Sequence, residues 1–307
     1  MMRTFLIDTD TASDDAVALI MALRHPDVRV AAVTVVGGNV PLEQATRNAL
    51  YTAELCGAAD VPVYAGAARP LLREPEHAEW FHGADGLGDQ GYRSAKSCCR
   101  REHATDAILS TIEQNPGLTL VTLGPLTNVA LALAREPGIV SRVARCVVMG
   151  GNPCCEGNVT PAAEYNMWVD PEAARMVLRS GLPIELVGWQ LCRGQANLSE
   201  GEIADARRID TPLARFAIDC NRSAMAANRA QTGDIGLALP DPVAMAVALD
   251  PSVCTSASVH RVEVETGSEL TRGMTVVDRL NVSGDARNRG VWGRPPGAAG
   301  GASDISR

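Results

Sequence analysis

Residues 3–24 read RTFLIDTDTASDDAVALIMALR, and this stretch carries the pattern that decides the fold. An apolar run at 4–7 is followed by a polar segment and then by the helical pattern of residues 16–23. Further apolar runs and helical patterns alternate at 28–36 and 42–56, at 118–123 and 128–133, and at 145–149 and 171–178. This alternation is typical of parallel βαβ units. It predicts an α/β fold in a single domain: a doubly wound, mostly parallel open sheet of the Rossmann-like type, with helices on both faces.

The composition is typical of a globular protein with a large core, because 46% of the 307 residues are hydrophobic. The net charge is −8 and Lys96 is the single lysine, so no basic segment favours nucleic acid as a partner. No run approaches the roughly 18 apolar residues of a membrane span, which argues against a membrane partner. The nine cysteines are odd in number and contain no CxxC pair, which favours a cytoplasmic location over a disulfide framework.

The chain is expected to form one domain over residues 1–280. Within it the periodicity fails at 67–101, where prolines and glycines mark a long loop that contains Trp80 and His82. Residues 281–307 are rich in glycine, arginine and proline. We therefore expect a disordered or atypical tail there, with neither a strand nor a helix.

Four aspartates lie between the first predicted strand and its helix, at Asp8, Asp10, Asp14 and Asp15. Carboxylates this close repel one another, and a bound cation removes that cost. An alternative is that Asp14 and Asp15 only cap the helix and interact with its dipole. That alternative leaves Asp8 and Asp10 unexplained. Because ligands bind beyond the carboxyl ends of parallel strands, we expect a metal site at this edge of the sheet.

A further carboxylate, Asp241, lies in the sequence LPDP at 239–242, before the helical run 243–249. On its own it is expected to be a helix N-cap followed by a proline at the first helical position. If it faces the first cluster, it adds a third ligand carboxylate beside Asp10 and Asp15. A shell made only of oxygens suits a hard cation, and Ca²⁺ tolerates such a shell best.

The segment DTDTASDDA at 8–16 resembles the N-terminal signature of the inosine-uridine preferring nucleoside hydrolase family. Seven more segments resemble later motifs of that family and occur in the same order. They are GGN at 37–39, HGADGLG at 82–88, GPLTN at 124–128, MGG at 149–151, GN at 157–158, AEYN at 163–166 and DP at 241–242. One such motif would be weak evidence, but the ordered set over about residues 4–280 is specific.

The resemblance implies Ca²⁺-dependent hydrolysis of the N-glycosidic bond of a ribonucleoside, a small-molecule substrate, with release of the free base and ribose. It implies a further role for Asp10 as general base on a metal-bound water, which the cation makes more acidic. The implied Ca²⁺ ligands are Asp10, Asp15, Asp241 and the backbone carbonyl of Leu123.

The ribose contacts that the resemblance implies are mostly carboxylate and amide side chains, which can bond a diol. Taken singly, the asparagines would be assigned to loop turns and the methionine to the core, but their order in the motifs favours the site. The resemblance also implies nucleoside salvage and assembly as a homodimer or homotetramer. The implied ribose contacts are Asp14, Asn39, Asn158, Glu164 and Asn166, with Met149 beneath the sugar ring.

Two positions depart from the family pattern. Ala12 replaces a usual glycine, so the turn is expected to be altered or strained. Pro240 stands where many members have a histidine that acts as general acid, or a stacking tryptophan. Because a general acid contributes roughly 10² to 10⁴ in rate, another group must replace it. His82 is the candidate donor, with an exposed loop histidine as the alternative, and Trp80 or Trp189 is the candidate for stacking on the base.

Two other functions stay open on the sequence alone. An apolar strand followed by Asp8-x-Asp10 also resembles a haloacid-dehalogenase-like phosphatase, which would need Mg²⁺ and a basic residue for the phosphate. The lone lysine lies in the irregular loop, and the later motifs have no place in that family. The second alternative is a ribose-binding protein of the same fold that keeps the metal site but has weak or lost turnover, because Pro240 cannot donate a proton.

Overall fold

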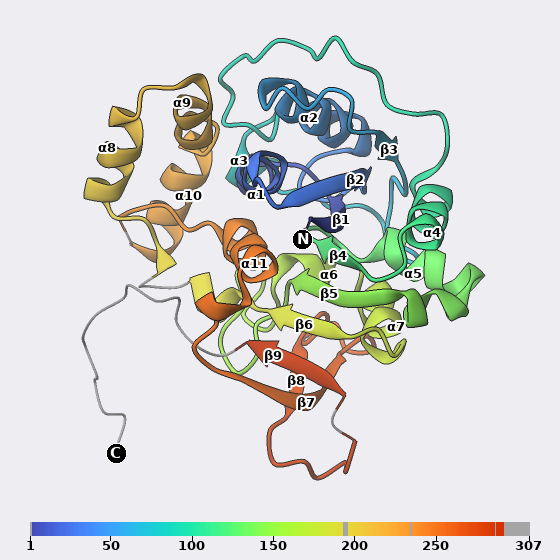
Figure 1. Ribbon diagram of the computed structural model, residues 1–307. Helices are drawn as coiled ribbons and strands as arrows, with labels where there is room; N and C mark the ends of the chain where they lie inside the picture. The colour runs from blue at the N-terminus through green and yellow to red at the C-terminus, as the bar shows by residue number, and fades with distance from the viewer. Residues whose placement is uncertain (1, 193–195, 234, 286, 292–307) are drawn as a thin grey trace.

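The computed structural model describes residues 2–192, 196–233, 235–285 and 287–291. These residues form a single sheet covered by helices (Figure 1). The strands in chain order are β1 (Arg3–Thr9), β2 (Val28–Val35), β3 (Val63–Ala65), β4 (Leu118–Thr122), β5 (Val143–Met149), β6 (Ile184–Val187), β7 (Ala257–Val264), β8 (Thr275–Asp278) and β9 (Asn288–Val291).

The strand order across the sheet is β3-β2-β1-β4-β5-β6-β9-β7-β8. Strands β1 to β6 and β9 pair in parallel, whereas β7 pairs antiparallel with β9 and with β8. From β1, the chain first builds outward to β2 and β3, and then returns to the other side of β1 for β4, β5 and β6. This reversal between β1 and β4 leaves a crevice beyond their carboxyl ends, where ligands bind in such sheets. The predicted doubly wound α/β fold is confirmed.

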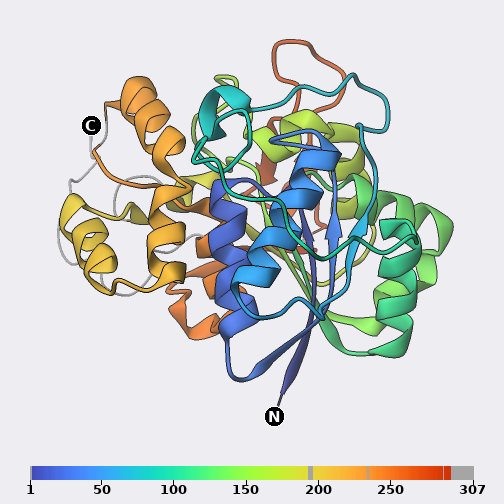
Figure 2. The same cartoon turned by 90° about the horizontal axis from the view of Figure 1, so that it is seen from above.

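The helices surround this sheet, and Figure 2 shows them on both sides of the strands. In chain order they are α1 (Ser13–Arg24), α2 (Leu42–Leu55), α3 (Glu79–His82), α4 (Ala104–Gln114), α5 (Thr127–Arg135), α6 (Tyr165–Val169), α7 (Pro171–Arg179), α8 (Glu200–Arg208), α9 (Pro212–Asp219), α10 (Arg222–Thr232) and α11 (Pro240–Leu249). Among the residues that the structure describes, no helix is long and apolar enough to cross a bilayer.

Two apolar cores lie on opposite faces of the sheet because side chains alternate along each strand. In β1, Phe5 and Ile7 point to the core shared with α1, α2 and α11. Leu6 points to the other core, shared with α4, α5 and α7. The strands are therefore buried on both sides, which explains why their sequences are continuously apolar rather than alternating.

Helices α8, α9 and α10 form a separate group beside α1 and α11, drawn in yellow and orange in Figures 1 and 2. Phe216 of α9 packs on Ala16 of α1 and attaches the group to the main domain. Helix α8 begins at a capping box in which Ser199 and Glu202 bond each other's backbone N–H groups. The group places α10 next to the carboxyl-terminal edge of the sheet.

Several elements differ from the sequence-based expectations. Asp241 is not the N-cap of α11, because Leu239 occupies that position and Pro240 is the first helical residue. Strand β9 lies in the segment 281–307, which was expected to contain no strand. Its sequence NRGV is hardly apolar, and backbone pairing with β6 and β7 on both sides holds it in the sheet. The rest of the expected tail, 292–307, lies outside the described residues.

A buried polar network fixes the carboxyl end of β1. The carboxylate of Asp8 accepts hydrogen bonds from Thr34 Oγ1 at 2.5 Å and from Asn128 Nδ2 at 2.9 Å. Asn128 also donates to the carbonyl of Val35 and accepts from the backbone N–H of Ala67. Burial raises the pKa of Asp8 to about 7, although both hydrogen bonds act in the opposite direction. Asp8 therefore supports the ends of the central strands.

Replacing Asn128 with alanine should destabilise the fold by about 2–4 kcal/mol, because the substitution leaves several buried polar groups without partners. Urea unfolding measures the change in the free energy of unfolding. Asn115→Ala, at the less buried end of α4, is the matched control and should cost less than about 1 kcal/mol. Equal losses in the two variants would contradict a central role for the network.

Candidate active site

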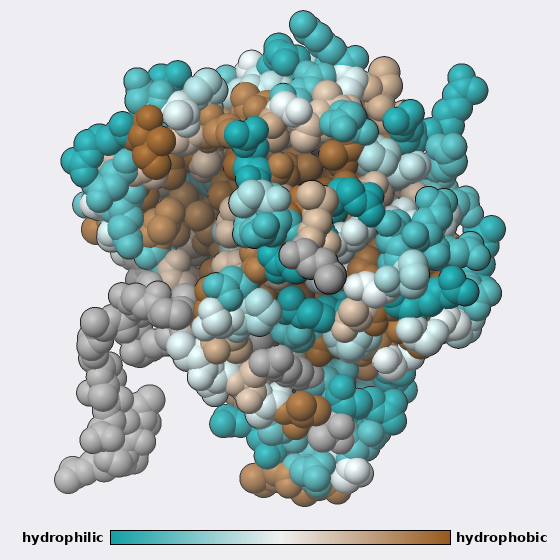
Figure 3. All heavy atoms as spheres, viewed as in Figure 1, coloured by the Kyte–Doolittle hydropathy of each residue, from teal (hydrophilic) through white to brown (hydrophobic). Residues whose placement is uncertain are grey.

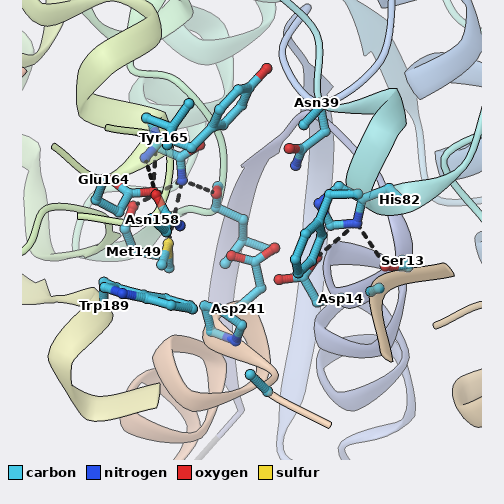
Figure 4. Close-up of a pocket in the computed structure, with 18 of the residues that line it drawn as sticks. Ser13, Asp14, Asn39, His82, Met149, Asn158, Glu164, Tyr165, Trp189 and Asp241 are labelled. Carbon is cyan, nitrogen blue, oxygen red and sulfur yellow. Dashed lines mark hydrogen bonds and ion pairs between the residues drawn. The ribbon is translucent and has the colours of Figure 1, made fainter. Parts of the chain in front are cut away.

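A pocket lies beyond the carboxyl ends of the central strands, where the strand order reverses (Figure 4). The space between its lining residues, counted together with the adjoining open solvent, is about 710 Å³. Residues of the β1–α1 turn, α3, α6, α10 and the start of α11 surround it. Of the predicted site residues, those that line the pocket are Asp14, Asn39, Trp80, His82, Leu123, Met149, Asn158, Glu164, Asn166 and Asp241.

Asp10 and Asp15 lie beneath the pocket and are fully buried. The Oδ2 atom of Asp10 accepts a hydrogen bond of 2.7 Å from the backbone N–H of Asn39. Among the described residues, its Oδ1 atom has no hydrogen-bond partner. A Cβ atom on Gly38 would lie 2.1 Å from Oδ2, and one on Gly124 would lie 2.6 Å from Oδ1. The two glycines therefore leave the space that the Asp10 carboxylate occupies.

Asp14, Asp15 and Asp241 bring carboxylate oxygens within 4.8 Å of one another, a spacing that suits the ligands of one metal ion. This trio differs from the predicted ligand carboxylates, because it contains Asp14 in place of Asp10. Asp15 accepts hydrogen bonds from Thr9 Oγ1 at 2.5 Å and from the Ala12 N–H at 2.9 Å, so its carboxylate is fixed. The Oδ1 atom of Asp14 has no hydrogen-bond partner in the described part of the chain.

The pKa values of these carboxyl groups are all raised. Burial is the largest cause at Asp10 and Asp241, and the neighbouring aspartates add to it, so both pKa values lie well above the usual range. The pKa of Asp14 is raised to about 6, and that of Asp15 is also raised, in both cases mainly by burial. A cation at this place would favour the charged carboxylates that burial and mutual repulsion disfavour. The donor set thus fits a hard divalent ion.

Ala12 does not strain the turn that holds these groups. It is the N-cap of α1 and has a φ of −106°, an extended conformation that any residue adopts. The expected distortion at this replaced glycine is therefore absent from the turn. Its N–H donates to Asp15 Oδ2, and its carbonyl accepts a hydrogen bond from the N–H of Ala16.

One side of the pocket presents fixed polar groups. Glu164 caps α6, and its two carboxylate oxygens accept hydrogen bonds from the N–H groups of Asn166, Met167 and Gly151. The Asn166 amide donates to the Leu123 carbonyl at 2.7 Å. That carbonyl, the predicted backbone ligand, still has a second lone pair. Figure 4 shows Glu164 and Met149 together on this side of the pocket.

Asn158 and Asn39 border the same space. The Oδ1 atom of Asn158 accepts from the Tyr165 N–H at 2.9 Å, so its amide nitrogen is left for other partners. Gln231 of α10 donates to the Asn158 carbonyl at 2.8 Å and joins the two walls of the pocket. The Tyr165 hydroxyl donates to the Glu76 carbonyl at 2.8 Å. Each wall is therefore tied to a segment distant in sequence.

The opposite side contains His82, which is only 7% exposed and so is not the solvent-exposed loop histidine of the alternative interpretation. Its Nδ1 atom lies 2.8 Å from Ser13 Oγ and 3.9 Å from Asp14 Oδ1. Burial lowers the pKa of His82 to about 4, against the opposing effect of Asp15, so the ring is neutral at pH 7. Trp80 is 60% exposed at the pocket rim, and Pro240 lines the same pocket.

Trp189, the other candidate for stacking on the base, lines the pocket below Met149 in Figure 4. Several further lining residues were not singled out in the sequence. Ser13 lies inside the first motif, so its position could have suggested it. Asn221 and Gln231 carry no such signal, because they come from α9–α10, whose packing against the sheet edge is not encoded in any short motif. The polar residues missed are Ser13, Tyr165, Asn221 and Gln231.

The sequence model of the inosine-uridine preferring nucleoside hydrolases matches residues 5–298, nearly the whole chain. The chain belongs to this family. It is 40% identical to an uncharacterized protein of Schizosaccharomyces pombe (strain 972), over 89% of this chain and 88% of that protein. It is 38% identical to the pyrimidine-specific ribonucleoside hydrolase RihA of Shewanella sp. (strain MR-7), over 95% of this chain and 91% of RihA.

A solved structure shows the same fold. The purine-preferring ribonucleoside hydrolase from Gardnerella vaginalis is similar with a TM-score of 0.89 and 29% identity, over 95% of this chain and 94% of that one. Membership of the nucleoside hydrolase family leaves the phosphatase alternative without support. RihA is pyrimidine-specific and the Gardnerella enzyme is purine-preferring, so the family includes both classes of base preference.

A divalent cation such as Ca²⁺ should raise the melting temperature of chelator-treated protein by about 5 °C or more at saturating concentration, because an ion that binds only the folded state stabilises it. Thermal unfolding with Ca²⁺, Mg²⁺ or chelator measures the effect. Asp241→Asn should remove most of the shift, whereas the exposed control Asp60→Asn should keep it. An equal melting temperature with Ca²⁺ and with chelator would contradict a cation site.

Proposed function

We propose that this family member hydrolyses the N-glycosidic bond of ribonucleosides and releases the free base and ribose. The observation that carries the proposal is a single pocket with two unlike ends. Buried carboxylates and fixed amides gather at one end, where a sugar diol would bind. The other end has aromatic side chains and His82, which suit a flat heterocycle.

We propose Ca²⁺ as the resident cation, held by Asp10, Asp15, Asp241 and the carbonyl of Leu123. The buried, partnerless oxygens and the raised pKa values support a cation here, and the all-oxygen donor set favours Ca²⁺. When bound, the ion would supply positive charge that makes the attacking water more acidic. The short distances from Asp14 to Asp15 and Asp241 put this residue beside the same site.

Asp10 is proposed as the general base. The N–H of Asn39 fixes Oδ2 and leaves Oδ1 available, so one oxygen is oriented while the other can accept the proton of the water. Gly38 and Gly124 lie against its two oxygens, at places where a Cβ atom would clash with the carboxylate. The orientation therefore exists before the substrate binds, which is the condition under which a base is most effective.

The ribose is proposed to bind between Asp14, Asn39, Asn158, Glu164 and Asn166, above Met149. Glu164 is immobilised by three backbone N–H groups, and Asn166 by its bond to the Leu123 carbonyl. Groups held in this way can orient sugar hydroxyls without further loss of side-chain entropy. Met149 supplies an apolar surface at the end of β5.

His82 is proposed to help the base depart, because Pro240 has no proton to donate. The ring is neutral, so it acts as a hydrogen-bond donor to the heterocycle rather than as a charged acid. Trp80, an exposed residue that lines the pocket, is proposed to cover the base. A ribose-binding protein with weak turnover is the second candidate function, and Pro240 is the observation that favours it.

We further propose assembly as a homodimer or homotetramer, and nucleoside salvage in the cytoplasm. Exposed apolar side chains gather over the β7–β8 hairpin, at the lower edge of the face in Figure 3, where a second copy could cover them. They include Val276 of the edge strand and, in the adjoining loops, Leu270 and Leu280. The nine cysteines are all free thiols, which fits a reducing compartment.

Asp10→Asn should lower kcat for nucleoside hydrolysis by about 10³-fold or more while the melting temperature stays within a few degrees, because the amide cannot accept the proton. Release of ribose and base from uridine, cytidine, inosine and adenosine measures the rate, with and without chelator. Asp60→Asn, an exposed aspartate, should behave as wild type. Near-normal turnover in Asp10→Asn would refute the assigned role.

His82→Ala should lower kcat/KM for nucleosides by roughly 10²-fold, yet change that for p-nitrophenyl riboside by less than about threefold, since its leaving group requires no proton. His25→Ala, at the C-cap of α1, is the control and should leave the kcat/KM for both substrates unaffected. A similar loss on both would assign His82 to ribose binding instead. Cleavage of the activated riboside alone by the wild type would favour the ribose-binding candidate.

A further inference from the structure

Asn221 is a fully buried residue that borders the pocket but belongs to none of the motifs, and it precedes the first residue of α10. Its amide nitrogen donates to the Ala217 carbonyl at 2.9 Å and lies 3.4 Å from the Ser13 carbonyl. Among the described residues, its Oδ1 atom has no hydrogen-bond partner. A buried acceptor without a partner is costly, so a native structure that contains one calls for an explanation.

The orientation of this amide is fixed by its neighbours. Carbonyl oxygens only accept hydrogen bonds, so the NH₂ group must face Ala217 and Ser13, and a flipped amide would place oxygen against oxygen. The Oδ1 atom is therefore held on the other side of the amide. The acceptor is rigid and needs no rearrangement to receive a donor.

Asn221 lies at the base end of the pocket. Ser13 connects it to His82, because the Ser13 carbonyl faces the Asn221 amide while the Ser13 hydroxyl contacts His82 Nδ1 at 2.8 Å. Glu164, a proposed ribose contact, lies across the pocket from His82 in Figure 4. Because His82 is the proposed contact of the departing base, Asn221, which Ser13 links to it, is assigned to the base end of the pocket.

We propose that Asn221 is a specificity-determining residue, whose Oδ1 atom accepts a hydrogen bond from an N–H on the edge of the base remote from the sugar. This inference rests on the proposed nucleoside hydrolysis. Uracil and hypoxanthine offer a ring N–H, and cytosine and adenine offer an exocyclic amine. A base in which that N–H is methylated loses the donor and brings a methyl group to a buried oxygen, which a rigid polar site rejects strongly.

The test compares each nucleoside with its N-methylated partner: uridine with 3-methyluridine, inosine with 1-methylinosine, and cytidine and adenosine with their N,N-dimethyl forms. For the nucleoside that the wild type cleaves best, kcat/KM should exceed that of the methylated partner by about tenfold or more. In Asn221→Ala and Asn221→Leu the two kcat/KM values should differ by no more than about threefold. Two variants are used so that a folding defect in one does not end the experiment.

Asn48→Ala is the matched control. Asn48 is also a buried asparagine that donates to the carbonyl of the first motif, at Thr11, but its Oδ1 atom accepts a bond from Gln44 and it does not line the pocket. It should change both substrates of a pair by the same factor. The inference about Asn221 would be overturned, and the proposed function left standing, by either of two results. One is a kcat/KM ratio near one between the nucleoside and its methylated partner in the wild type. The other is an unchanged ratio in both Asn221 variants. Failure of the wild type to cleave any nucleoside would overturn the proposed function and, with it, this inference.

Discussion

The repulsion among buried carboxylates is the constraint around which the rest of this structure is arranged. Asp10, Asp14, Asp15 and Asp241 meet in a space from which water is largely excluded, and each has a raised pKa. Such a cluster costs stability unless a cation or a network of donors offsets it. The central strands, the N-terminus of α1 and the first turn of α11 supply the rigid frame that holds these charges together.

The sequence predicted the parts of this arrangement that depend on neighbouring residues. The apolar run before Asp8 and the helix after Asp15 determine a βα unit by local pattern alone, and the Gly-rich segments at the other strand ends mark close approach to it. Gly38 and Gly124 show the reason, since their missing side chains leave the space of the Asp10 carboxylate. Residues implied by the family motifs, including Glu164 and Asn166, line the same pocket.

Features that depend on long-range packing could not be predicted from the sequence. Asn221 and Gln231 reach the pocket only because α9 packs on α1 and carries α10 to the sheet edge. Strand β9 has almost no apolar pattern, since its place is determined by backbone pairing on both sides. Helix α11 begins at Pro240 because proline favours the first helical position. The sequence has a second proline directly after Asp241, and for that reason Asp241 was expected to be the N-cap.

The position of β9 has a consequence for the order in which the protein can be built. The β7–β8 hairpin precedes β9 in the chain, yet it joins the main sheet only through β9, which lies between β6 and β7. During synthesis on the ribosome the hairpin must therefore wait, with its inner edge unpaired, until residues 288–291 have emerged. The central strands that hold the carboxylates are complete long before then. The floor of the pocket can therefore form while the edge of the sheet at β6 is still unpaired.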